Sequence, residues 1–83
     1  MIVNFHPHAL QRLTERGVTR VEVEQAILKG EKFVVKQGRV GFRHNFTFDG
    51  EWMGKFYRNK QIEVFVVLES DCWLVITVIS KYF

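Results

Sequence analysis

The first residues in the chain that could do chemistry are a histidine and two arginines at helical spacing. His8, Arg12 and Arg16 follow one another at intervals of four residues, so a helix would present them on one side. An imidazole titrates near neutral pH and can move a proton, and guanidinium groups bind phosphate oxygens. This face therefore fits acid–base chemistry on a phosphodiester. A solvated face with Glu15 paired to an arginine is the alternative that spacing alone leaves open.

A second candidate is the segment "GKFYRNK" (54–60), where basic and aromatic residues alternate. It contains Lys55, Tyr57, Arg58 and Lys60, which we expect to lie around one turn. Cations neutralise the phosphates of RNA, and an aromatic ring stacks on its bases. The same composition is typical of a charged hairpin end that blocks edge-to-edge pairing.

Two positions within expected strands complete the candidates. Arg43, with Asn45, alternates with Phe42 and His44, so it lies on the other face of its strand and could contact a phosphate backbone. Thr77 interrupts the apolar run "VITVI", and its hydroxyl could face a cleft. Each position also has a structural alternative. Arg43 could lie on an ordinary solvated strand face, and the Thr77 hydroxyl could form a local hydrogen bond within its strand.

Clear signals delimit two helices that would carry the first group of residues. Pro7 favours a helix start and Gly17 a helix end. Thr19 and Glu22 form the T-x-x-E pattern of a capping box, and Gly30 ends the second helix. The two helices are joined by a few residues and form a helical hairpin.

From residue 32 onward the hydrophobic period changes to two, which predicts strands. The expected strands are 32–36, 40–48, 51–57, 62–69 and 72–80, with turns at the Asp49-Gly50 pair, at 58–61 and at 70–71. The near-continuous apolar runs of the last two strands predict central strands covered on both faces. The sequence therefore predicts an α+β fold, with two N-terminal helices packed on an antiparallel four- or five-stranded sheet.

Composition bounds the class of protein. The 83 residues fit a single domain (1–83), with 47% hydrophobic and 25% charged residues and a formal net charge of +3. That charge weakly favours an anionic partner. One cysteine, Cys72, excludes an internal disulfide, and the absence of a signal-peptide pattern or a long apolar run predicts a cytoplasmic protein away from membranes. The carboxylates are scattered, and we expect neither a metal nor a cofactor.

Several of these stretches together resemble a known family. "HALQRLTERGVT", "GKFY" and "VITV" are similar to small prokaryotic domains of unknown function whose helical signature reads H-A-x-x-R-x-x-x-R-G. That family is grouped with the barnase/EndoU/colicin/RelE-like nuclease fold and with toxins of toxin–antitoxin systems. The matching positions are His8, Arg12, Arg16, Lys55, Tyr57, Lys60 and Thr77. The resemblance implies a substrate that crosses the sheet near the first helix.

The resemblance implies a metal-independent endoribonuclease that cleaves through the RNA 2′-hydroxyl. Such a reaction needs a base, an acid and cations around the phosphate. We expect His8 as base or acid, with Tyr57 or Lys60 as its complement. The expected catalytic group is completed by Arg12 and Thr77, and the phosphate-binding group is Arg16, Arg43, Lys55 and Arg58.

The expected partners are RNA, with ribosome-associated mRNA as one form of it, and a small antitoxin protein. A non-catalytic module that binds RNA or protein on the same surface is the alternative function. A third reading is an interaction protein whose exposed strand accepts a partner by strand addition.

Overall fold

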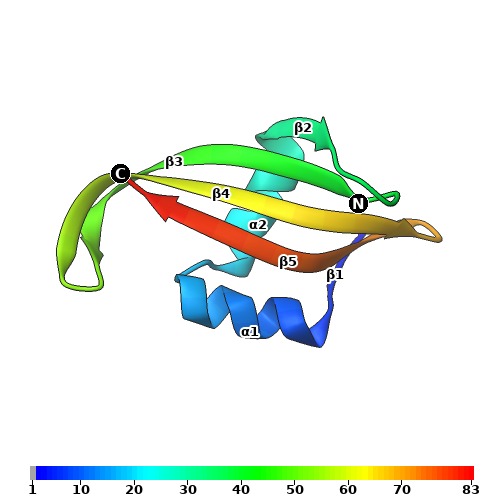
Figure 1. The fold of residues 1–83 in the computed structure, drawn as a ribbon, viewed down its shortest axis with the longest axis horizontal. Helices are drawn as coiled ribbons and strands as arrows, with labels where there is room; N and C mark the ends of the chain where they lie inside the picture. Colours follow the sequence, from blue (N-terminus) through cyan, green and yellow to red (C-terminus); the bar gives the residue numbers. More distant parts are fainter. Residues whose placement is uncertain (1) are drawn as a thin grey trace.

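The computed structural model describes residues 2–83, which form a five-stranded sheet with two helices (Figure 1). In chain order the elements are β1 (Ile2–Phe5), α1 (Pro7–Arg16), α2 (Arg20–Lys29), β2 (Glu31–Val34), β3 (Val40–Trp52), β4 (Lys55–Glu69) and β5 (Cys72–Tyr82). The α+β class and the early position of both helices are confirmed.

The sheet is mixed. Its strand order is β1-β5-β4-β3-β2, in which β1 runs parallel to β5 and all other neighbours are antiparallel. The prediction of a purely antiparallel sheet is therefore wrong at one edge, where β1 precedes the helices. The four residues of β1 pair with the last strand of the chain, so no local turn or neighbouring strand signals their conformation.

The ends of the helices follow the predicted signals. His6 caps α1, and its Nδ1 accepts a hydrogen bond from the backbone N–H of His8 at 3.1 Å. Gly17 ends α1 in the left-handed conformation, at φ 65°. Thr19 and Glu22 form the capping box, because each side chain accepts a hydrogen bond from the backbone N–H of the other.

Both helices pack on the same face of the sheet. Figure 1 shows α2 crossing behind the sheet and α1 running alongside β5. The buried core consists of Ala9, Leu13, Val18, Val23, Ala26, Ile27, Phe42, Ile62, Val64, Val66, Val75 and Val78. Its members on β4 are alternate residues, so their neighbours on β4 point to the opposite face. The prediction that β4 and β5 are covered on both faces is wrong, because no described helix covers that opposite face.

The hairpin between β3 and β4 differs from the prediction. β3 continues to Trp52 and turns at Met53 and Gly54, whose φ values are 53° and 80°. A β-bulge lies at Phe48 and Asp49 instead, where the register shifts between the pairs Thr47–Asn59 and Gly50–Tyr57 and Asp49 has φ 43°. Asp tolerates positive φ better than most residues, in a bulge as well as in a turn, and Asp49 therefore lies where the hairpin bends (Figure 1).

The predicted turn at 58–61 is absent. β4 runs without interruption from Lys55 to Glu69, and Lys60 pairs with Phe46 on β3 and with Tyr82 on β5. The polar residues that suggested a turn alternate between two environments: Lys60 is buried under the helices, while Gln61 lies on the uncovered face. Lys55, Tyr57, Arg58 and Lys60 therefore follow a strand and do not surround a turn.

Candidate nucleic-acid interface

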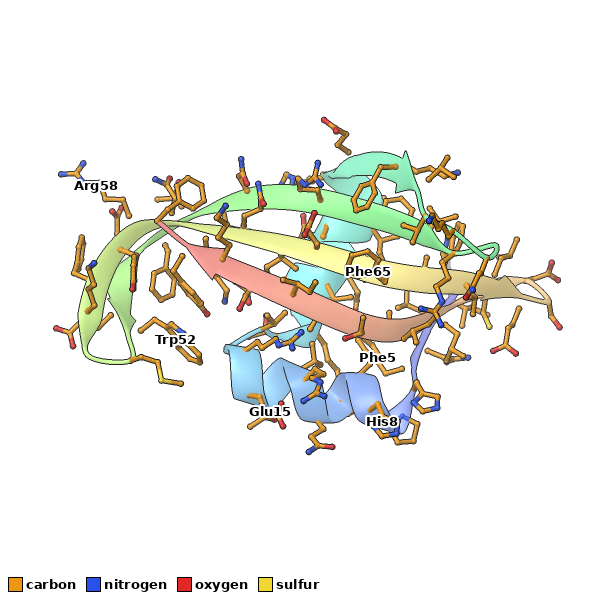
Figure 2. The ribbon with its side chains drawn as sticks, in the orientation of Figure 1. Phe5, His8, Glu15, Trp52, Arg58 and Phe65 are labelled. Carbon is orange, nitrogen blue, oxygen red and sulfur yellow. The ribbon has the colours of Figure 1, made fainter. Side chains whose placement is uncertain are left out.

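The α1 residues occupy the side of the molecule that carries the helices. His8 is exposed near the start of α1, and its ring stacks on that of His6 at 5.2 Å between centroids (Figure 2). Arg16, at the other end of α1, donates to the carbonyl of Val78 on β5. That contact ties α1 to the sheet, so Arg16 serves at least as a packing residue.

Arg12 forms a local ion pair on α1. Its Nη1 lies 2.5 Å from Oε2 of Glu15, and both side chains are more than two-fifths exposed. The hydrogen bond from Arg12 lowers the pKa of the Glu15 carboxyl, with a smaller contribution from Gln11. At Arg12 the structure therefore has the alternative given in the sequence analysis, a solvated helix face on which Glu15 is paired to an arginine.

Replacing Arg12→Ala should raise the pKa of Glu15 toward its ordinary value, because the main cause of the lowering is removed. A carboxyl with a lowered folded-state pKa stabilises the fold above its unfolded-state pKa, and loses that contribution as pH falls through the folded-state pKa. The stability of the variant should therefore fall less steeply than that of the wild type as the pH is lowered through the pKa of Glu15. An NMR titration of the Glu15 carboxyl carbon checks the shift, and an unchanged pKa would contradict the assigned cause.

Lys60 is buried among helix and hairpin residues. It is 3% exposed, and its Nζ donates to the carbonyl of Gly17 and to Glu22 Oε1, the latter at 2.9 Å. The ammonium also lies 5.6 Å from the ring centroids of Phe48 and Tyr82. Because its ammonium is both buried and hydrogen-bonded to Gly17 and Glu22, Lys60 has a structural role.

The bent hairpin end holds the other basic and aromatic candidates. The ring of Tyr57 lies 5.7 Å from that of Tyr82, and Lys55 Nζ lies 5.5 Å from the Tyr57 ring. Trp52 stacks on Tyr82 at 5.0 Å. Arg58 is exposed and points away from the molecule at this end (Figure 2).

The predicted catalytic group is not brought together. His8 lies near the start of α1, whereas Lys60 bonds to Gly17 at its end, and nine residues of helix span about 13 Å. Figure 2 shows His8 and Trp52 toward opposite ends of α1. Thr77 is paired with Phe65 and lies on the face away from both helices. The candidates thus divide among α1, the hairpin end and the uncovered face of the sheet.

That uncovered face, which we call the open face, is built from register rows that cross the strands. One row consists of Phe33, Gly41, Phe65 and Thr77; the next consists of Glu31, Arg43, Glu63 and Ile79; the third consists of Asn45, Gln61 and Lys81. The rows follow directly from the pairing of β2, β3, β4 and β5. Two candidates from the sequence, Arg43 and Thr77, lie here in adjacent rows.

The open face has a hollow of about 420 Å³ lined by Arg43, Gln61, Glu63, Ile79 and Lys81. A second hollow of about 300 Å³ lies beside it and is lined by Glu31, Arg43, His44 and Asn45. Arg43 borders both. The larger hollow, which we call the open-face pocket, joins two cations, a carboxylate and an amide on rigid strands.

Arg43 is held in place from several sides. Its Nε and Nη2 donate to Glu63 Oε2 at 2.9 and 2.6 Å, and its guanidinium lies 4.7 Å from the centroid of the Phe33 ring. Glu31 Oε1 is 3.8 Å from Nη1. The Phe33 ring occupies the space above Gly41, where a Cβ would come within 2.3 Å of it. Gly41 therefore allows the ring to lie flat under Arg43.

Three polar residues of the open-face pocket were missed from the sequence: Gln61, Glu63 and Lys81. The period-two alternation correctly places Arg43 and Asn45 on one face. The same rule applied to "IEVFVVLE" would have placed Glu63, a carboxylate within an apolar run, on a face with Phe65. The false turn at 58–61 hid Gln61 from this argument.

Neither a metal site nor a membrane-spanning helix is found among residues 2–83. Within this range, no three His, Cys, Asp or Glu side chains gather where they could hold a metal ion. No helix within the same range combines the length and apolar composition needed to cross a membrane.

These features define a small α+β domain with both helices on one face of a mixed sheet and a polar pocket on the other. The chain matches the family model described as Domain of unknown function (DUF4258) over residues 5–80, and it belongs to that family. The predicted membership of a small family of unknown function is thereby confirmed. No curated protein and no solved structure matches the chain.

Proposed function

We propose that this protein is a metal-independent endoribonuclease whose RNA lies across the open face. The observation that carries the proposal is the open-face pocket, where Arg43 and Lys81 line one hollow together with the amide of Gln61. Guanidinium and ammonium groups bind phosphate oxygens, and side-chain amides bind base edges or sugar hydroxyls. Because these groups stand on paired strands, their spacing is fixed before RNA arrives.

Aromatic rings in the neighbouring row support an RNA ligand. Phe33 and Phe65 are half-buried and pack edge to face at 6.0 Å. Sheet-borne aromatic rings are a common platform on which single-stranded bases stack. A strand of RNA that places a phosphate in the pocket would bring its bases toward this row.

The charge pattern of the segment that follows Glu31 favours an anionic partner. Residues 32–43 contain four Lys or Arg and no Asp or Glu, although the whole chain has a net charge of only +3. This segment forms most of β2, the connection to β3 and the start of β3. Lys32 lies on the helix side with its register partner Phe42, so the cations of this segment that could attract a phosphate backbone beside the open face are Lys36 and Arg39, in the connection, together with Arg43.

The binding test compares Lys81, on the open face, with Lys29, on the helix side, because the two side chains carry the same charge at different positions. Lys81→Ala should weaken the binding of a single-stranded RNA, and should reduce the slope of log K against log salt concentration by about 0.7, as expected for one lost phosphate contact. Lys29→Ala, on the helix side, should leave the affinity within about twofold. Fluorescence anisotropy at several salt concentrations measures both. Equal weakening by the two variants would mean that net charge alone attracts RNA, and would contradict the assigned interface.

The cleavage test uses the purified chain with RNA in the presence of a chelator. Products ending in a 2′,3′-cyclic phosphate and a 5′-hydroxyl are expected, because the 2′-hydroxyl is the proposed nucleophile. Binding without cleavage would leave the non-catalytic RNA-binding module as the function. Binding only to a protein partner would overturn the proposal.

A role as the toxin of a toxin–antitoxin-like pair follows from the proposed cleavage. Expression should arrest growth, and co-expression of a small partner encoded beside it should relieve the arrest. If high-level expression is harmless while the purified protein still cleaves RNA in vitro, the toxin role is wrong and the endoribonuclease activity stands.

A further inference from the structure

We infer that Glu63 is the general base of the proposed cleavage and that Lys81 protonates the leaving oxygen. The inference rests on the proposed function, and it places the reaction on the open face of the sheet, away from α1 and His8. It is carried by the composition of the open-face pocket, in which the carboxylate of Glu63 lines the same hollow as Arg43 and Lys81.

A carboxylate in this position has little use in binding alone. Glu63 is paired with Arg43 and so offsets a charge that a surface that only binds RNA would leave free for phosphate. Transphosphorylation requires such a group, because the 2′-hydroxyl must lose its proton as it attacks phosphorus. The presence of Glu63 among Arg43, Lys81 and Gln61 therefore favours catalysis over simple retention.

The hydrogen bonds of Glu63 leave one oxygen available. Both bonds from Arg43 go to Oε2, at 2.9 and 2.6 Å. Among residues 2–83, no donor is recorded for Oε1, and the side chain is 23% exposed. Arg43 thus fixes the orientation of the carboxylate through one oxygen, while the other can accept a proton from substrate.

The position of Lys81 suits the opposite side of the same phosphate. Lys81 pairs in register with Gln61, and Glu63 pairs with Ile79, so Glu63 and Lys81 are diagonal neighbours on adjacent strands. Diagonal neighbours on one face are roughly 7–8 Å apart at the backbone, a distance that a long side chain can span. A phosphodiester placed between them would have its 2′-oxygen toward one and its 5′-oxygen toward the other.

The step balances without any further reactant. Glu63 takes the proton of the 2′-hydroxyl, the 2′-oxygen forms a bond to phosphorus, and the bond from phosphorus to the 5′-oxygen breaks. Lys81 gives a proton to that departing oxygen. Arg43 stabilises the charge that builds on the non-bridging oxygens. The products are a 2′,3′-cyclic phosphate and a 5′-hydroxyl, and the two side chains then exchange protons with water.

The test of the base uses Glu63→Gln, with Glu24→Gln on the exposed side of α2 as the matched control. The amide keeps a hydrogen-bond acceptor for Arg43, so the fold and the pocket should survive. Cleavage of RNA by Glu63→Gln should fall about 100-fold or more, while binding of a strand with a 2′-deoxy scissile nucleotide stays at least as tight. Wild-type cleavage rates in Glu63→Gln would overturn the inference and leave the proposed function standing.

The test of the acid uses a substrate whose leaving 5′-oxygen is replaced by sulfur. A thiolate departs without protonation, so the loss caused by Lys81→Met should be large on normal RNA and small on the sulfur-substituted strand. An equal loss on both substrates would show that Lys81 only binds phosphate. If His8→Ala abolishes cleavage and Glu63→Gln does not, the base belongs to α1 and the inference is wrong. If wild-type protein binds RNA and cuts neither substrate, both the inference and the nuclease function fail, and binding remains.

Discussion

Lys60→Met should cost about 3 kcal/mol of stability, near the lower end for removing one partner of a buried ion pair. The side chain is 3% exposed, and its ammonium bonds to Glu22 and to the carbonyl of Gly17. Methionine fills a similar volume and supplies no donor, so the Glu22 carboxylate would be left partly buried without its cation. For a domain of this size, the melting temperature should fall by roughly 12 °C or more.

The control for this prediction is Lys32→Met, since Lys32 is exposed on β2. It should change stability by less than about 0.5 kcal/mol. A second variant, Glu22→Gln, tests the pair from the other side, and the double variant should cost less than the sum of the two single changes. Urea or thermal unfolding followed by circular dichroism measures all four. A Lys60→Met protein as stable as the wild type would show that Lys60 has no structural role and would restore it as a free cation.

Gly17→Ala should cost about 2–5 kcal/mol, for two reasons that add. Gly17 has φ 65°, a conformation that costs an L-residue about 1–2 kcal/mol. A Cβ there would also lie 2.4 Å from the Trp52 ring and 2.7 Å from the Tyr82 hydroxyl. Moving the Trp52 ring, which stacks on Tyr82, adds about 1–3 kcal/mol of overpacking.

Gly38→Ala separates the two contributions. Gly38 has a similar φ of 72°, but nothing lies within 4 Å of the position that its Cβ would take. This variant should therefore cost only the conformational part, about 1–2 kcal/mol. Chemical denaturation of the two variants gives the difference. Equal losses would mean that the bent hairpin moves away from α1 at no cost.

Local rules predicted the helices well, because their ends are determined by nearby residues. Pro7, Gly17 and the Thr19–Glu22 capping box act within one turn, and the structure has each of them where the sequence placed it. The β3–β4 hairpin was harder. Asp49-Gly50 suits a bulge as well as a turn, and the choice depends on packing of the aromatic hairpin end against α1, which no short window contains.

The candidate site was predicted less well, because the register between β3, β4 and β5 determines which side chains meet on the open face. Arg43 and Thr77 were recognised as residue types, yet their placement on one face requires knowing that β3, β4 and β5 pair as they do. Alternation places Glu63 on a face with Phe65, but its contact with Arg43 depends on the register between β3 and β4. Lys60 was predicted from local composition as a free cation. In the structure it is buried beneath α1 and α2, where its ammonium bonds to Gly17 and Glu22.

The pairing of β1 with β5 has a consequence for the synthesis of the chain. β1 is parallel to β5, and α1 bonds to β5 through Arg16 and through Ser80 and Tyr82, which donate to the Arg16 carbonyl. β5 is synthesised after β1 and α1, so both leave the ribosome before their partner exists. Lys81 is delivered with the same strand. A nascent chain therefore has neither the β1–β5 pair nor the full lining of the open-face pocket until β5 has been made.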